Sequence, residues 1–291
     1  MGLSVTRCRL QGMVLATNKK TIAELAKLPA PLRESALLQL QKIDALEVPP
    51  EIPAAQLATL VRMLACSEYA ATVFLREGGW LLAQDLEQPP SVEHLQHFAA
   101  EIGHSDKPAS AIQSEIRRYR HRYFLHVLWR EFDEAATLND TLYAISDLAD
   151  GLLKAATEYA HREVSERCGA VRDENGNEVS LVVLGMGKLG GRELNFSSDI
   201  DVIFLHPDGS DSDGDKSLSP HEYFTRVTRR VISLLEEATA DGFAFRVDTR
   251  LRPFGDSGPP VSSFAALESS LLQLGRGWEG CGYVRARWGG A

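Results

Sequence analysis

The chain has 291 residues, of which 44% are hydrophobic and 24% are charged, so it can bury a sizeable core and its length favours two domains over one. Its formal net charge of −9 argues against a protein that binds nucleic acid through bulk positive charge. The cysteines Cys8, Cys66, Cys168 and Cys281 form no Cys-x-x-Cys pair, which favours reduced thiols over a disulfide framework or a zinc site.

The first 20 residues contain no apolar core of the kind that a signal peptide has, and no apolar span long enough to cross a membrane. We therefore expect a cytoplasmic protein with neither a membrane nor a nucleic acid as its partner.

Residues 21–133 show apolar positions spaced three and four apart, the pattern of amphipathic helices in a bundle. Pro29, Pro31 and Pro49 divide this region into separate helices. Ser67 and Ser91 are expected N-caps, because a serine hydroxyl accepts hydrogen bonds from the first helical turn. The pattern predicts an N-terminal helical domain over residues 1–133.

Residues 111–133 combine many arginine, histidine and aromatic side chains. Such a mixture occurs at single-stranded nucleic acid sites and in phosphate-binding grooves. Helical spacing accounts for more of it, since one stripe collects Ile116, Tyr119, Tyr123 and Val127. This packing interpretation places the arginines on a solvated or partner-facing side. In the alternative, one or two of them line a nucleotide cleft.

The next segments predict a long helix followed by the first strand of a sheet. An apolar stripe favours a helix over residues 141–167, and the polar loop that follows contains the turn signal Asn175-Gly176. Leu181–Leu184 is an apolar strand, and a glycine-rich turn with a short helix comes after it. We expect this strand to open the catalytic domain.

Two aspartates stand at the start of the next strand. Asp199 and Asp201 alternate with Ile200 and Val202, so the two carboxylates share one face and lie about 7 Å apart. Like charges this close favour a shared cation. Carboxylate oxygens with room for water and phosphate suit Mg²⁺. The sequence therefore predicts a site for phosphate chemistry.

A third carboxylate follows a polar loop and a crossover helix expected over residues 221–239. Over residues 243–252 the alternation predicts a strand with Leu251 on its apolar side, and with Arg246, Asp248, Arg250 and Arg252 on the other. Guanidinium groups suit phosphate oxygens. The simpler alternative is that aspartates and arginines at strand ends merely pair with each other.

Two long motifs carry a resemblance: GMGKLGGRELNFSSDIDVIF at residues 185–204 and GFAFRVDTRLRPFGDSGPPVSSFAALE at residues 242–268. The chain resembles the bifunctional glutamine synthetase adenylyltransferase/adenylyl-removing enzymes of the nucleotidyltransferase superfamily, and more closely their N-terminal, adenylyl-removing half. The upstream stretch ACSEYAATVFLREGGWL at residues 65–81 is similar to the helical region of the same family.

The resemblance and the chemistry of the side chains in the two motifs together indicate roles for nine residues. The catalytic and metal-binding carboxylates would be Asp199, Asp201 and Asp248. The nucleotide and phosphate would be bound by Lys188, Gly190, Gly191, Ser198, Arg250 and Arg252, with backbone N–H groups of the Gly190-Gly191 turn approaching the phosphate.

The resemblance also implies an α+β fold, in which an N-terminal helical bundle precedes a polymerase-β-like nucleotidyltransferase domain with a small mixed sheet. The expected domains are 1–133, 134–262 for catalysis, and 263–291 as the start of a truncated C-terminal helical region. The segment after Ser263 would be a helix with an uncovered apolar stripe, running to Trp278.

The implied reaction is phosphorolysis of adenylyl-tyrosine on glutamine synthetase. Mg²⁺, with two ions expected, would be the cofactor, and ATP or ADP and phosphate would be substrates. Glutamine synthetase and a PII-type signal protein would be partners. Two alternatives stay open: an inactive regulatory fragment that binds without turnover, and a nucleotidyltransferase that acts on another acceptor.

Overall fold

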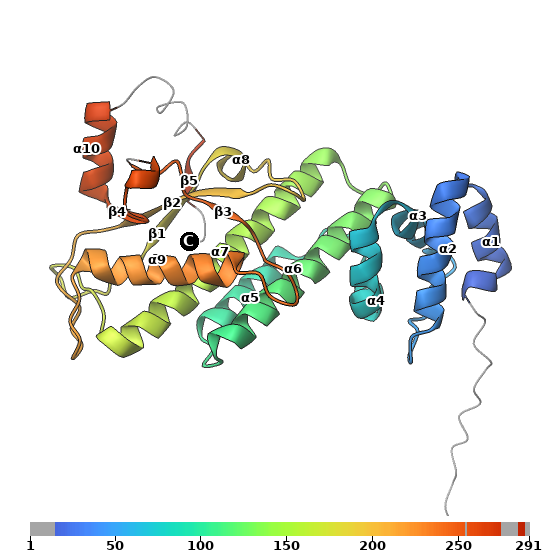
Figure 1. Ribbon diagram of the computed structural model, residues 1–291, viewed down its shortest axis with the longest axis horizontal. Coiled ribbons are helices and arrows are strands. Elements are labelled where there is room, and N and C mark those ends of the chain that lie inside the picture. Colours follow the sequence, from blue (N-terminus) through green and yellow to red (C-terminus); the bar gives the residue numbers. More distant parts are fainter. Residues whose placement is uncertain (1–14, 254, 275–284, 289–291) are drawn as a thin grey trace, which may run out of the picture. The chain divides into compact units, whose positions relative to one another are not determined.

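The computed structural model describes residues 15–253, 255–274 and 285–288 (Figure 1). Most of these residues lie in helices, and a small sheet is formed by the second half of the chain. None of the helices within the described ranges is both long enough and apolar enough to cross a lipid bilayer.

The chain forms two compact units. The first contains the described residues up to Gln88 together with Leu125–Ala136, and the second contains Pro89–Phe124 and the described residues from Thr137 onward. Helix α6 (Ala109–Phe132) therefore contributes to both units. The domain boundaries expected at residues 133 and 262 stay a prediction.

The first unit is a helical bundle around one apolar core. Its elements besides the end of α6 are the 3-10 helix η1 (Leu15–Thr17) and helices α1 (Lys19–Ala26), α2 (Ala30–Asp44), α3 (Leu57–Cys66) and α4 (Glu68–Leu82). Leu40, Leu60 and Phe74 are buried in this core, and Trp129 of α6 packs into it. The expected cap of α4 is confirmed, since the Ser67 hydroxyl accepts a 3.1 Å hydrogen bond from the backbone N–H of Ala70.

The second unit places helices on both faces of a sheet. Its helices besides α6 are α5 (Val92–Gly103), α7 (Leu138–Cys168), α8 (Gly187–Gly190), α9 (Pro220–Glu236), the 3-10 helix η2 (Gly255–Ser257) and α10 (Phe264–Leu274). Ser91 caps α5, as expected, and Thr137 and Asp140 form a capping box at the start of α7.

The sheet has the strand order β3-β2-β1-β5. β4 also pairs with β2, at residues that follow those paired with β3. Its strands are β1 (Val182–Gly185), β2 (Ile200–His206), β3 (Val247–Asp248), β4 (Val261–Ser263) and β5 (Arg287–Trp288). β1 is antiparallel to β2 and β5, whereas β3 and β4 run parallel to β2. The expected α+β fold with a helical bundle and a small mixed sheet is therefore confirmed.

Strand β2 is buried on both faces except at its start. On one face the imidazole of His206 stacks on Phe224 of α9, with ring centroids 5.3 Å apart. On the other face Ile203 and Leu205 belong to an apolar cluster that Leu267 of α10 covers. The face that carries Asp201 is therefore open only at the beginning of the strand.

The strand expected over residues 243–252 is much shorter than predicted. Only Val247 and Asp248 pair with β2, and the chain turns at Arg250 and Leu251. Leu251 is 38% exposed, so the prediction that it lies on the apolar side is wrong. The alternation ends because the chain leaves the sheet after two residues.

The prediction that the arginines outside the packed stripe of residues 111–133 lie on a solvated or partner-facing side is wrong for Arg117. The side chain of Arg117 is fully buried, and it donates hydrogen bonds to the backbone oxygens of Gln113, Leu234, Glu237 and Gly242. Two of these oxygens belong to the last turn of α9, where carbonyl groups lack partners inside the helix. Arg117 thus supplies donors to the end of α9.

Helix α10 begins where a helix was expected. The Ser263 hydroxyl accepts a 3.1 Å hydrogen bond from the N–H of Ala266, and Phe264, Leu271 and Leu272 are exposed. The expected continuation to Trp278 lies outside the described residues. On the described part of α10, the apolar stripe is indeed partly uncovered.

Candidate active site

Asp201 and Asp248 lie on adjacent parallel strands and are direct register partners. Parallel pairing places both side chains on the same face at the open start of β2. Burial raises the pKa of the Asp201 carboxyl, and the negative charges of Asp248 and Asp199 raise it further. The three carboxylates therefore act on one another electrostatically, as the sequence predicts.

Asp248 is held by an arginine from its own segment. Its side chain is only 14% exposed. Nε of Arg250 donates to both carboxylate oxygens, at 3.0 and 2.9 Å, and the backbone N–H of Arg250 donates at 2.9 Å. These hydrogen bonds lower the pKa of Asp248, so its carboxyl group stays ionised more readily than that of Asp201.

Asp199 precedes β2 and pairs with a different arginine. The guanidinium of Arg246 donates from Nε to the Asp199 carboxylate and from Nη2 to the backbone oxygen of Ser197, the latter at 3.1 Å. The sequence placed Arg246 on the same face as Asp248 but did not identify it as a partner of Asp199. The alternation of acid and base residues along the two segments was the available signal.

The turn between β1 and α8 is built against Asp201. The backbone N–H of Met186 donates to the backbone oxygen of Asp201 at 2.8 Å. Gly187 has φ +51°, and a Cβ atom at this position would lie 2.7 Å from Oδ2 of Asp201. The position therefore requires glycine for two reasons: its backbone conformation and the space that the carboxylate takes.

Gly190 and Gly191 close the same turn. Their N–H groups donate to the backbone oxygens of Met186 and Gly187, at 2.9 and 3.0 Å. A Cβ at Gly190 would lie 1.7 Å from the backbone oxygen of Arg285, so glycine lets these two chain segments approach closely. The structure thus gives Gly190 a packing role, and the predicted approach of these N–H groups to phosphate stays a prediction.

The remaining predicted residues lie around the carboxylates in different ways. Lys188 is exposed on α8, and its positive charge lowers the pKa of Asp201, as that of Arg250 does. Arg252 donates to the backbone oxygen and hydroxyl of Thr249, at 2.9 and 2.7 Å, so it holds the turn after β3. The Ser198 hydroxyl donates to Oδ1 of Asn195 at 3.0 Å within a tight turn.

The carboxylate oxygens at this site suit Mg²⁺ as ligands, but two of the three carboxylates form ion pairs with arginines. Carboxylate oxygens are the ligands that Mg²⁺ prefers. Among the described residues, no three His, Cys, Asp or Glu side chains are already placed to hold a metal ion. Asp199 and Asp248 are engaged by Arg246 and Arg250, and both guanidiniums are more than half exposed. Both ion pairs are therefore open to solvent on the guanidinium side.

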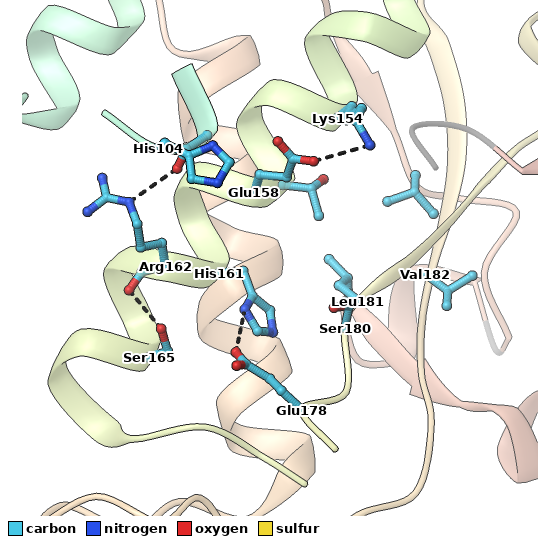
Figure 2. A pocket seen from close by; sticks show the side chains of 13 residues that line it. His104, Lys154, Glu158, His161, Arg162, Ser165, Glu178, Ser180, Leu181 and Val182 are labelled. Carbon is cyan, nitrogen blue, oxygen red and sulfur yellow. Dashed lines mark hydrogen bonds and ion pairs between the residues drawn. The ribbon is translucent and has the colours of Figure 1, made fainter. Parts of the chain in front are cut away.

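A separate cavity of about 610 Å³ lies between α5, α7 and the start of β1 (Figure 2). Its charges are mostly paired internally: Lys154 contacts Glu158 at 3.2 Å, and His161 contacts Glu178 at 3.3 Å. Val182 lines this cavity, whereas Asp201 lies past the opposite end of β1. The cavity is therefore distinct from the carboxylate site.

A glycine-rich turn packed against an Asp-x-Asp strand, with a third aspartate on the neighbouring parallel strand, defines a nucleotidyltransferase-type site. A family model described as glutamate-ammonia ligase adenylyltransferase matches residues 57–290. The chain belongs to this family.

Three curated relatives carry the name bifunctional glutamine synthetase adenylyltransferase/adenylyl-removing enzyme. The protein of Chromobacterium violaceum is 41% identical over 81% of this chain, that of Shewanella oneidensis is 41% identical over 81%, and that of Stenotrophomonas maltophilia is 38% identical over 90%. The matched segments cover 26%, 25% and 27% of these relatives. The chain thus spans about a quarter of their length.

Proposed function

We propose that this chain carries out adenylyl transfer at phosphorus, and that it removes the adenylyl group from a tyrosine of glutamine synthetase. The observation that carries the proposal is the register of Asp201 with Asp248, with Asp199 beside them, in a chain of the adenylyltransferase family. The removing direction is supported by the resemblance of the two long motifs to the N-terminal half of such enzymes.

In this proposal Asp199, Asp201 and Asp248 hold Mg²⁺, with two ions expected. When bound, the metal stabilises negative charge on the phosphoryl oxygens. Lys188 and Arg250 carry positive charges beside the carboxylates and would neutralise the phosphate groups of the substrates. Asp201 is partly buried, which strengthens its electrostatic interactions with anything bound there.

The reaction proposed is a phosphorolysis. An oxygen of inorganic phosphate forms a bond to the adenylyl phosphorus while the bond from that phosphorus to the tyrosine oxygen breaks. The tyrosine leaves as a phenolate that takes up a proton, and the nucleotide leaves as ADP. Positioning and charge neutralisation are the main contributions that a protein makes to transfer at phosphorus.

The partner and compartment follow from the same proposal. The names of the relatives specify glutamine synthetase, which we propose as the protein substrate of this chain. We also propose a PII-type signal protein as a regulatory partner, on the resemblance of the two motifs alone. We place the activity in the cytoplasm, where reduced thiols persist, because Cys66 and Cys168 are free.

The test is incubation of the purified chain with adenylylated glutamine synthetase, inorganic phosphate and Mg²⁺, followed by measurement of ADP. We expect ADP formation with the wild type and a loss of at least about a hundredfold with Asp201→Asn, which keeps the side-chain shape and removes a proposed metal ligand. Asp215→Asn is the matched control, because Asp215 is exposed in a loop away from the site.

The outcomes separate the alternatives. Binding of glutamine synthetase without ADP formation would support a regulatory fragment. Transfer to or from a different acceptor, lost equally in Asp201→Asn, would support a nucleotidyltransferase with another substrate. Wild-type turnover in a correctly folded Asp201→Asn variant would refute the assignment of the carboxylates.

A further inference from the structure

An arginine-rich groove lies between α7 and α9, on the side of α9 that faces away from the sheet. Its accessible volume is about 310 Å³, and it is lined by Arg167 and Cys168 of α7 and by Arg226, Arg229 and Arg230 of α9. The sheet-facing side of α9 is formed instead by Phe224, Val227 and Val231, which are fully buried. Helical geometry places the two sets on opposite sides of α9, so the groove is separate from the carboxylate site.

Positive charge exceeds negative charge in this groove. Glu163 is the one acidic residue in its lining, against four arginines, which leaves a formal charge of +3 in a chain whose net charge is −9. The Glu163 carboxylate accepts hydrogen bonds from Arg167 at 2.9 Å and from Arg230 at 2.8 Å. In the cavity of Figure 2, by contrast, Lys154 and His161 each contact a glutamate of their own.

Arg226 and Arg229 are the cations that this glutamate does not neutralise. Both are exposed, and within the described part of the chain neither guanidinium forms an ion pair with a carboxylate. Arg226 donates a hydrogen bond to Sγ of Cys168, at 3.7 Å. Glu222, one turn earlier, interacts with Arg226 electrostatically, but its carboxylate is held by the Ser219 capping box.

This arrangement is unfavourable without a counter-ion. Like charges three and four residues apart on a helix destabilise it, and Arg226, Arg229 and Arg230 have these spacings. An anion in the groove relieves the repulsion. A guanidinium presents paired N–H donors that match two oxygens of a phosphate group. The volume lies at the lower end of the range for small-molecule pockets, which suits a small anion better than a large ligand.

We propose that the α7–α9 groove is a binding site for a small phosphate-bearing anion, held chiefly by Arg226 and Arg229 and assisted by Arg167 and Arg230. The ligand is inorganic phosphate or a small phosphomonoester, since both present the same oxygens. The site does not involve the metal-binding carboxylates, so it stands independently of the proposed function.

The test is calorimetric titration of the full chain with inorganic phosphate in low salt and EDTA, which prevents metal-dependent binding. We expect saturable binding that the double variant Arg226→Gln/Arg229→Gln weakens by at least about tenfold. Lys19→Gln/Lys20→Gln is the matched control, because it removes two exposed positive charges from α1 and should bind as the wild type does.

A parallel titration with glycerol phosphate distinguishes the two ligand sources. Tighter binding of glycerol phosphate than of phosphate identifies a phosphomonoester site, and the reverse identifies a site for the free ion. The proposal is overturned if the folded double variant binds phosphate as the wild type does, or if the wild type shows no saturable binding at millimolar phosphate. Thermal melting establishes that each variant is folded.

Discussion

The Cα atoms of Asp201 and Asp248 face each other across the parallel β2–β3 pair, although 46 residues separate them in the chain. Their electrostatic environments differ. Asp248 is satisfied by Arg250, which lowers its pKa, whereas burial and neighbouring negative charge raise the pKa of Asp201. Of these two carboxylates, Asp201 therefore gains more from a bound cation.

Gly187→Ala should disable the site more than it destabilises the fold. The positive φ costs an alanine roughly 1–2 kcal/mol, and its Cβ would displace the Asp201 carboxylate. Gly176→Ala is the matched control, because Gly176 has φ +82° but nothing within 4 Å of its Cβ position. Turnover and urea unfolding measure the two effects. Equal activity in the two variants would contradict a role for Gly187 at Asp201.

Arg250→Ala should weaken nucleotide or phosphate binding by about tenfold and change the free energy of unfolding by less than about 1 kcal/mol. The side chain of Arg250 is 74% exposed, so its pair with Asp248 contributes little to stability. Arg246→Ala, which frees Asp199 instead, should reduce affinity less. Calorimetry with ADP and thermal melting provide the measurements. A large fall in melting temperature with unchanged affinity would make Arg250 a structural partner only.

Arg117→Met should destabilise the fold by about 3 kcal/mol or more, because it leaves several buried backbone oxygens without donors. Arg117→Lys should restore only part of this loss, since one ammonium group cannot reach all of the oxygens. Arg118→Met, at an exposed position of the same helix, is the control. Urea unfolding measures each difference, and indistinguishable curves for the Arg117→Met and Arg118→Met variants would refute the capping role.

His126 should make stability depend on pH. Burial, and next the charge of Arg130, lower its pKa to about 4 from the usual 6.5. Between these values the unfolded chain binds more protons than the folded one, so stability is highest above pH 6.5 and falls as the pH drops toward 4. The full effect is about 3 kcal/mol.

The free energy of unfolding, measured with urea, should therefore change more between about pH 7.5 and about pH 5 for the wild type than for His126→Gln. His94→Gln is the control, because His94 is exposed on α5. The assignment fails if wild type and His126→Gln respond equally to pH.

Local pattern was sufficient to predict most of the helices and the first two strands. Serine caps, proline breaks and apolar spacing are properties of neighbouring residues, so Ser67 and Ser91 could be assigned from sequence alone. The alternation of the two motifs and their resemblance to one family placed Asp199, Asp201 and Asp248 at one site, but the register of Asp201 with Asp248 was not predicted. Periodicity failed for Leu251, because the chain leaves the sheet after Asp248 although β2 continues to His206, and alternation alone does not show where a strand ends.

Partners that are distant in sequence could not be predicted. Three of the four oxygens that accept from Arg117 lie more than 110 residues away on α9 and beyond it, and no spacing within α6 identifies them. The partner of Arg246 could not be predicted either, because the pair depends on a turn at Ser197 that brings Asp199 to the guanidinium. The reason for glycine at position 190 lies in the backbone of Arg285.

The division of helix α6 between two compact units limits how this chain can be cut or recombined. A fragment that starts at Thr137 loses α5 and Arg117 from the sheet-bearing unit, whereas one that starts at Pro89 keeps Leu125 and Trp129 without the apolar core that receives them. The two units are interleaved in sequence, so no single breakpoint separates them. Exchange of one unit between relatives therefore requires three junctions, one of them inside a continuous helix.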